Sequence, residues 1–256
     1  MSEPAALSLA LYDQVFAHAQ AEYPREACGL ICENKRGAVV YQRCRNVAPD
    51  DAARDRFHIH PEDWAQAEDL YERILAIVHS HPDASAEPSS ADRAGCFASG
   101  LAWYVIAVPG GAMRKIEPEP LPLVGREFAH GAVDCYSLVR DYYAQVLAIE
   151  LPDFEREDGW WERGQDLYRE NFAAAGFVDL GPPLGIEGGT AEIRVHDGLL
   201  MQVAARRENH AAVFVGPVYG VDCILHHLYG QLSQHNPWGG EWLRRTTSVL
   251  RHKSFL

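Results

Sequence analysis

The sequence predicts a protein of mixed α/β (α+β) class that is built from two domains. Its 256 residues are 47% apolar and 23% charged, which is typical of a globular chain with room for two ordinary domains. Short apolar runs bounded by glycine and proline alternate with stretches of helical spacing, and this favours sheets covered by helices. Closely spaced prolines between Glu117 and Gly125 favour extended backbone and divide the chain. We therefore expect domains at residues 1–117 and 125–256.

Charge and cysteine content exclude several classes of function. The chain has 23 Lys and Arg against 36 Asp and Glu, a net charge of −13, and neither half is basic. Nucleic acid is therefore not an expected partner. The six cysteines show no paired framework and the start is not signal-like, which favours synthesis in a reducing cytoplasm. No apolar run approaches the ~20 residues that a membrane span needs.

The first half begins with the pattern of a helix followed by strands. Residues 7–20 have the helical spacing expected of a helix that covers a sheet. Glu26 is predicted to lead into an apolar strand that ends at Cys32. A neighbouring strand is predicted at Val39 to Tyr41. The polar residues 46–56 are predicted to form a surface loop that can border a cleft.

A His-x-His pair after a buried strand is the strongest signal in this half. Ile74 to Val78 is an apolar run that ends at His79 and His81. Residues two apart on extended chain face the same side, so both imidazoles can reach one ion. Pro88 to Ser90 is a predicted helix start that places Asp92 in the first turn, from where its carboxylate can return to the histidines. These three ligands leave a fourth tetrahedral position open, as catalytic zinc needs.

Other interpretations of these residues were weighed. His58 and His60 repeat the same spacing, but they lead directly into a helical stretch from Glu62 and lack a buried strand before them. We interpret them as a strand-to-helix junction. Asp83 is a rival third ligand, although it lies only two residues past His81 and beyond a stiff proline. In the simplest alternative, the histidines merely end the strand.

The first half resembles the MPN/JAMM metalloprotease family. The family pattern is a glutamate just ahead of a Cys-Gly-Leu-type strand, then His-x-His-Pro, seven residues, Ser, two residues and Asp. This sequence matches it throughout. The resemblance implies a β-sheet flanked by helices, with Zn²⁺ held by His79, His81 and Asp92. It also implies that Glu26 takes a proton from the attacking water and that Ser89 helps to hold the oxyanion.

The first domain is predicted to close with a hairpin. Leu101 to Val108 is an apolar strand that ends at a Pro-Gly-Gly turn, and Met113 to Ile116 returns as its partner.

The second half opens with a helix that presents a cysteine. Asp134 is a candidate cap for a helix carrying Leu138, Val139 and Tyr142, so Cys135 falls in the first turn. The positive end of the helix dipole is expected to lower the pKa of that thiol, as a thiolate nucleophile requires.

Three strands are predicted downstream, at Leu199 to Val203, His210 to Gly216 and Cys223 to His227. A histidine at the head of one strand and another on the next can converge on the helix start. Together with the cysteine they provide a nucleophile, a base and an orienting group.

This half resembles the NlpC/P60 cysteine peptidases over about residues 125 to 256. The family pattern is Asp-Cys at a helix start, His at the head of a strand closing in Gly, and a polar residue, often His, on the next strand. Cys135, His210 and His226 occupy these positions, which implies a papain-like α+β domain. Tyr136 departs from the usual Asp-Cys-Ser-Gly and can reshape the substrate side. The alternative is that Cys135 is an inert buried cysteine.

Two adjacent tryptophans, Trp160 and Trp161, begin an aromatic stretch that continues to Phe172. Such a stretch usually packs in a core, and it can also form a wall for a sugar-peptide.

The two domains in this order resemble the phage tail assembly protein K family, from phages of the lambda type and related prophages. The stretch Asp134 to Tyr143 and the tryptophan pair are close to that family. The resemblance implies a protein associated with phage tail-tip proteins, whose second half is an endopeptidase for peptidoglycan stem peptides. It also implies a location in the host cytoplasm during assembly and afterwards in the virion tail.

Three hypotheses follow from the sequence. The leading one is a two-headed hydrolase of amide bonds, zinc-dependent in one half and thiol-dependent in the other. The second is a tail scaffold in which zinc only stabilises the fold. The third is a bacterial wall-remodelling peptidase unrelated to phage.

Overall fold

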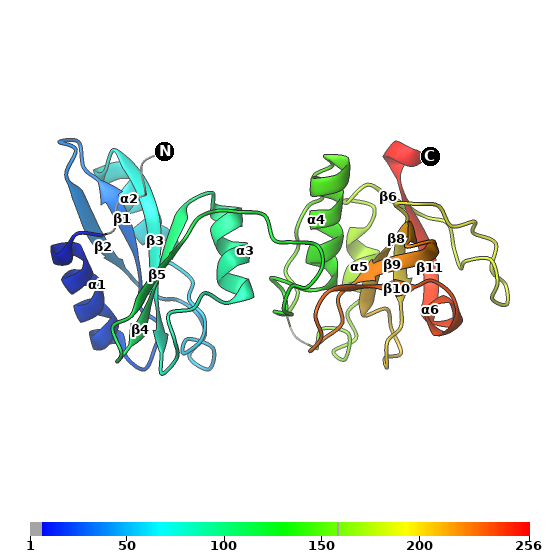
Figure 1. Cartoon of the computed structure of the whole chain (residues 1–256), viewed down its shortest axis with the longest axis horizontal. Coiled ribbons are helices and arrows are strands. Elements are labelled where there is room, and N and C mark those ends of the chain that lie inside the picture. Colours follow the sequence, from blue (N-terminus) through cyan, green and yellow to red (C-terminus); the bar gives the residue numbers. More distant parts are fainter. Residues whose placement is uncertain (1–6, 158) are drawn as a thin grey trace. The chain divides into compact units, whose positions relative to one another are not determined.

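The chain folds into two compact units, Met1–Pro120 and Leu121–Leu256, in a computed structural model that describes residues 7–157 and 159–256 (Figure 1). Each unit contains one sheet with helices packed on it, so the predicted mixed α and β class and the two domains are confirmed. In the described residues, no helix is long and apolar enough to cross a bilayer.

The first unit is a five-stranded sheet in the order β2-β1-β3-β4-β5. β3 and β4 run parallel and are joined by α3, whereas the other neighbours pair antiparallel. α1 covers one face of the sheet, while α2 and α3 pack on the other. The elements of this unit are α1 (Leu9–Glu22), β1 (Cys28–Glu33), β2 (Val39–Cys44), α2 (Pro61–Leu70), β3 (Arg73–Pro82), α3 (Ser90–Ser99), β4 (Ala102–Val108) and β5 (Met113–Ile116).

The His-x-His pair lies inside β3 and not after it, which differs from the prediction. β3 continues to Pro82 because β4 pairs with it along its length, down to the pair Pro82 and Val108. His60 caps α2 by accepting a hydrogen bond from the Glu62 backbone, as the predicted junction requires, but an isolated bridge between Ile59 and Asn46 precedes the helix in place of a strand.

The second unit is a six-stranded antiparallel sheet in the order β10-β9-β8-β7-β11-β6. α4 packs on one face, and the other face is covered by a cluster that includes Trp238 and Trp242. The elements of this unit are α4 (Cys135–Leu147), α5 (Leu167–Asn171), β6 (Phe177–Asp179), β7 (Gly198–Met201), β8 (His210–Val218), β9 (Val221–His226), β10 (Gln234–Pro237), α6 (Gly240–Arg245), β11 (Thr246–His252) and η1 (Lys253–Phe255).

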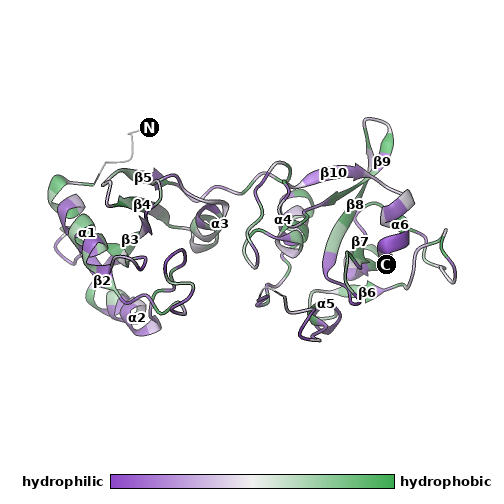
Figure 2. Ribbon diagram, turned by 90° about the horizontal axis from the view of Figure 1, so that it is seen from below, coloured by the Kyte–Doolittle hydropathy of each residue, from purple (hydrophilic) through white to green (hydrophobic). Residues whose placement is uncertain are grey.

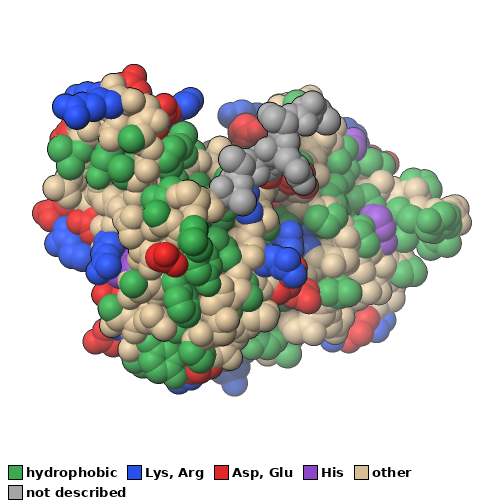
Figure 3. Space-filling model, turned by 60° about the vertical axis from the view of Figure 1, so that its left-hand side comes forward, with side chains coloured by type: hydrophobic (Ala, Val, Ile, Leu, Met, Phe, Trp, Pro, Cys, Tyr) green, Lys and Arg blue, Asp and Glu red, His purple; other side chains and the backbone are tan. Residues whose placement is uncertain are grey.

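Hydropathy follows this layering. Hydrophobic residues dominate the central strands of both sheets, whereas β10 and α6 are mostly hydrophilic (Figure 2). On the face drawn in Figure 3, Lys and Arg side chains are interspersed with Asp and Glu.

The proline-rich connection is partly fixed to the second unit. The Leu121 carbonyl accepts hydrogen bonds from Gln145 at 3.0 Å and from Arg126 at 3.3 Å, and Leu121 itself is buried. The predicted linker of Glu117 to Gly125 is therefore shorter than its prolines suggested, because its second half packs against this unit.

Candidate metal centre and thiol site

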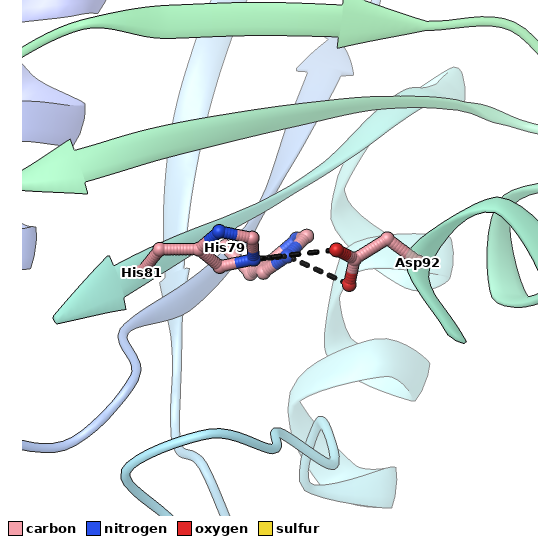
Figure 4. A group of neighbouring side chains, drawn as sticks. All are labelled: His79, His81 and Asp92. Atoms are coloured by element: carbon pink, nitrogen blue, oxygen red, sulfur yellow. Dashed lines mark hydrogen bonds and ion pairs between the residues drawn. The ribbon is translucent and has the colours of Figure 1, made fainter. Parts of the chain in front are cut away.

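Two histidines and an aspartate meet on one face of the first sheet (Figure 4). The Nε2 atom of His79 lies 3.0 Å from Asp92 Oδ1, and the Nε2 atom of His81 lies 3.3 Å from Asp92 Oδ2. The two Nε2 atoms are 3.2 Å apart. Among the described residues, this is the one group of three or more His, Cys, Asp or Glu side chains with metal-ligand spacing.

The strand and the helix that follows it explain this convergence. His79 and His81 are two apart on β3, so their rings leave the same face of the sheet. α3 crosses that face and begins at Ser89, with Asp92 in its first turn, as predicted. The cap is reciprocal, since Ser89 Oγ accepts from the Asp92 backbone at 3.1 Å and Asp92 accepts from the Ser89 backbone at 2.7 Å.

The tautomer of His81 suits a metal ligand. Its Nδ1 lies 2.8 Å from the Ser85 carbonyl oxygen, which can only accept, so Nδ1 carries a proton, and loss of the Nε2 proton leaves a lone pair there for a metal. The Phe57 ring stacks on His79 at 4.7 Å, and Trp103 meets the same ring edge-on at 5.4 Å. Both imidazoles are therefore held in place by neighbours.

The protonation preferences of His79 and Asp92 suit a cation, whereas that of His81 favours a proton. Burial lowers the pKa of His79, which keeps that imidazole neutral. Burial works against the charged form of His81, but its hydrogen bonds to Asp92 and Ser85 outweigh this and raise its pKa. Burial likewise opposes the Asp92 carboxylate, yet its bonds to both histidines hold its pKa well below the usual range. Imidazole and carboxylate are donors that zinc accepts, so the residues present fit the ion that the sequence implied.

Glu26 lies beside this cluster. In the antiparallel pairing of β1 and β3, Cys28 is opposite His79, so the same register continued by two residues sets Glu26 against His81. The Glu26 backbone is held at both ends by the predicted surface loop, through the Ala53 carbonyl at 2.7 Å and the Asn46 amide at 3.0 Å. Burial raises the pKa of Glu26 to about 8, opposed by His81 and assisted by Asp92.

The Ser89 hydroxyl donates a hydrogen bond to the Asp92 carboxylate. Its Oγ lies 2.8 Å from Asp92 Oδ2, in addition to accepting from the Asp92 backbone. The serine is thus within reach of the cluster, and its proton is directed at the candidate ligand.

The rival ligands are engaged elsewhere. Asp83 accepts hydrogen bonds from the Tyr23 hydroxyl and from Arg54, the latter at 2.6 Å. His60 is occupied as a helix cap. Neither His58 nor His60 belongs to the described group with metal-ligand spacing.

In the second unit, Cys135 lies in the first turn of α4, directly after its cap Asp134. Its Sγ lies 3.0 Å from the Tyr168 hydroxyl, and Ala211 of β8 belongs to the same buried cluster. The side chain is buried beneath the aromatic stretch, in which Trp160 is core and packs on Tyr168.

The expectation that the helix dipole lowers the pKa of the Cys135 thiol is not met in this structure. Burial raises the pKa to about 11, and the charge of Asp134 adds to this, while Tyr168, the Ala211 backbone and Arg156 act in the opposite direction. The loss of water around the sulfur outweighs the favourable helix terminus.

The two candidate histidines form a relay that ends in an asparagine. His210 Nε2 lies 3.1 Å from His226 Nδ1, and His226 Nε2 lies 2.7 Å from Asn236 Oδ1. If the amide oxygen accepts from His226, then His226 Nδ1 accepts from His210, and His210 Nδ1 keeps its lone pair as a base. Trp242 packs edge-on against His226 at 4.4 Å.

Asn236 was not predicted from the sequence, and no role was assigned to Tyr168. Asn236 lies on the polar strand β10, which has no apolar alternation that would mark it as a strand. Cys135 and Ala211, the residue after His210, belong to one buried cluster. In the described part of the chain, the hydrogen bond of the Cys135 side chain goes to Tyr168 and not to His210.

Comparison with known proteins adds family information to this geometry. Residues 8–117 match the family of prokaryotic homologs of the JAB domain, and residues 125–251 match the NlpC/P60 family. A solution structure of a protein from Desulfitobacterium hafniense aligns with 43% of this chain and 88% of its own, at 22% identity and a TM-score of 0.34.

Two curated relatives share both halves. Tail tip assembly protein K of Escherichia phage N15 is 41% identical over 245 residues, which cover 94% of this chain and 93% of the relative. Tail tip assembly protein K of Escherichia phage lambda is 40% identical over 195 residues, which cover 76% of this chain and 89% of the relative. The resemblance seen in the sequence is confirmed, and the chain belongs to the tail tip assembly protein K family.

Proposed function

We propose that this protein takes part in phage tail tip assembly and carries two separate peptidase sites. The relatives named tail tip assembly protein K support the first part, and the two donor sets support the second. The proposed place of the protein is the host cytoplasm during assembly and then the virion tail, with other tail-tip proteins as partners.

The second unit is proposed to be a thiol-dependent endopeptidase for peptidoglycan stem peptides. The relay from His210 through His226 to Asn236 is the observation that carries this proposal, because it leaves a lone pair on one ring nitrogen of His210, although burial lowers the pKa of that imidazole. That nitrogen takes the proton of Cys135, and the thiolate attacks the carbonyl carbon of the peptide. The resulting imidazolium then protonates the leaving amine, and water releases the acyl group.

The first unit is proposed to be a zinc-dependent hydrolase of amide or isopeptide bonds. His79, His81 and Asp92 are the residues that hold the ion, and a zinc ion bound there supplies a Lewis acid that activates water and the scissile carbonyl. Glu26 serves as the general base that takes the proton of the attacking water and passes it to the leaving amine. Ser89, at the rim of the cluster, is proposed to assist in holding the oxyanion while it also contacts Asp92.

Cleavage of purified muropeptides, with and without a chelator and a thiol blocker, tests the division of labour. Cys135→Ser should abolish cleavage while zinc content is unchanged, and His79→Ala should lose zinc while cleavage persists. Cleavage that survives Cys135→Ser and disappears with chelator would make the first unit the wall hydrolase. A protein that cleaves nothing but still binds tail-tip proteins would be the scaffold of the second hypothesis.

The role of Glu26 has its own test. Glu26→Gln should keep zinc at wild-type stoichiometry and lose hydrolysis by the first unit, because the amide cannot take a proton. Loss of zinc from this variant would show that Glu26 is needed to hold the ion.

A further inference from the structure

A buried arginine lies next to the cysteine of the second unit. Arg156 donates from Nε to Asp134 Oδ2 at 2.8 Å and from Nη2 to Asp134 Oδ1 at 3.3 Å, so the two side chains form a forked ion pair. Its remaining bonds go to the Gly131 and Phe154 carbonyls and to Asp153. The side chains of Arg156 and Asp134 are only 1% and 3% exposed, so this pair is almost fully removed from water.

Two aromatic rings enclose the guanidinium. The Arg156 Cζ atom lies 5.0 Å from the ring centroid of Tyr136 and 5.0 Å from that of Phe154. Tyr136 is the residue that departs from the small serine usual after the Asp-Cys pair in the NlpC/P60 pattern. The Tyr136 ring therefore packs against the Arg156 guanidinium, and the Tyr136 hydroxyl donates a hydrogen bond to the Pro152 carbonyl at 2.8 Å.

Asp134 connects Arg156 to Cys135, the candidate nucleophile. Its carboxylate accepts from the Ser137 backbone at 2.9 Å and from the Gly131 backbone at 3.1 Å, which ties down the first turn of α4 immediately before Cys135. A buried carboxylate without a cation destabilises a neighbouring thiolate, because like charges repel strongly where water is absent. Arg156 is the cation bonded to this carboxylate.

We propose that Arg156 is a positioning residue for Cys135, which acts through Asp134 by fixing the first turn of α4 and by cancelling the carboxylate charge beside the sulfur. This proposal rests on the thiol-dependent function proposed above, because cancelling the carboxylate charge bears on catalysis only where Cys135 reacts as a thiolate. Asp134 caps helix α4. Because Arg156 neutralises the Asp134 carboxylate, this charged cap does not repel a thiolate at Cys135.

The other titratable groups near the thiol leave this role to Arg156. Tyr168 bonds to the sulfur from α5. His130 and His227 interact electrostatically with Asp134, and Asp153 pairs with Arg156 from the half-exposed side.

The test is the rate at which iodoacetamide labels Cys135 in the full-length protein, measured as a function of pH by mass spectrometry of the Cys135 peptide. This readout needs no peptidoglycan, so it reports on the ion pair even if the chain cleaves no muropeptide. The variants are Arg156→Met, Arg156→Lys, Asp134→Asn and the double variant Asp134→Asn with Arg156→Met.

Arg156→Met should lower the labelling rate near neutral pH about tenfold, which corresponds to an upward shift of about one unit in the thiol pKa. Arg156→Lys should stay closer to wild type, because it keeps the charge. Asp134→Asn should label faster than wild type, and the double variant should return towards it.

A merely structural role predicts the opposite order, because loosening the fold exposes the thiol and speeds its labelling. Arg156→Met that labels as fast as wild type or faster would overturn the proposal. If this variant does not fold, Asp134→Asn is compared with the double variant, in which both charges are replaced together. The proposal then requires the double variant to label more slowly, and equal rates would contradict it.

Discussion

At the scale of single residues, His81 and His60 show why identical spacing has different consequences. His81 faces Asp92, and its Nδ1 donates a hydrogen bond to the Ser85 carbonyl. His60 instead caps α2, because its Nδ1 accepts a hydrogen bond from the Glu62 backbone. The sequence favoured the first pair because a buried strand precedes it. The structure adds the carbonyl of Ser85, which no spacing pattern could have indicated.

We therefore expect His81→Ala to abolish zinc binding and His60→Ala to leave one zinc per chain. Metal analysis of the two purified variants after dialysis against zinc measures this. Retention of zinc by His81→Ala together with its loss in His60→Ala would move the site to the rival pair.

Ser89→Ala should weaken zinc binding about tenfold and slow hydrolysis, because the hydroxyl donates to the Asp92 carboxylate and caps its helix. Competition with a chromophoric chelator gives the affinity. Ser90→Ala is the matched control, since it removes the neighbouring hydroxyl and should bind zinc like wild type. Unchanged affinity in Ser89→Ala would leave the serine with the oxyanion role alone.

Cys135 marks the limit of residue-level prediction. Its place in the first turn of α4 follows from the sequence around Asp134. Its surroundings do not, because Tyr168 reaches the sulfur from a segment whose aromatic residues have no pattern that tells core from cleft. The burial of Cys135 depends on segments that are distant in the sequence. The expectation of a lowered pKa for its thiol was therefore wrong for this structure.

At the scale of elements, the close approach of α3 to β4 depends on a glycine. A Cβ atom at Gly95 would lie 2.5 Å from the Trp103 ring, which is buried and held by a hydrogen bond from its Nε1 to Ser99 at 3.0 Å. The same ring packs edge-on against His79. The missing side chain therefore lets the helix that carries Asp92 lie near the strand that carries the histidines.

Gly95→Ala should destabilise the first unit by ~1–3 kcal/mol and weaken zinc binding, although alanine in a helix normally stabilises it by ~0.5–1 kcal/mol. The sign of the change in melting temperature is thus diagnostic. Gly110→Ala, where nothing lies within 4 Å of the added atom, is the control and should melt like wild type. A more stable Gly95→Ala variant would refute the packing argument.

Elements with strong apolar patterns were predicted, and polar ones were not. β3, β4, β8 and β9 correspond to apolar runs, and the starts of α3 and α4 follow from their capping residues. β10 and α6 carry polar residues that only the completed sheet orders, and so Asn236 escaped notice.

At the scale of the whole molecule, each unit has its own sheet and core, and the two sets of candidate residues do not interleave in sequence. A fragment of residues 121–256 should fold and keep the thiol-dependent activity. A fragment that starts at Leu123 would lack Leu121, whose carbonyl accepts a hydrogen bond from Arg126, which is buried.

We expect the fragment that starts at Leu121 to melt at a higher temperature than one that starts at Leu123, because the shorter fragment removes the acceptors of two Arg126 donors, the Leu121 and Pro122 carbonyls. Circular dichroism melting curves measure this, with Cys135 labelling as a check of the site. Equal melting temperatures would show that this segment is dispensable for the second unit.

The strand-helix-strand crossover from β3 through α3 to β4 also bears on the order in which the chain matures. The three candidate ligands are local, so the loop that must close to gather them is short, whereas the thiol relay needs residues from α4 to β10. During synthesis the first unit can complete its ligand set while the second is still emerging. A polypeptide interrupted before β10 would then hold its candidate metal ligands but lack Asn236, and so the candidate thiol site would be complete only after β10 has been made.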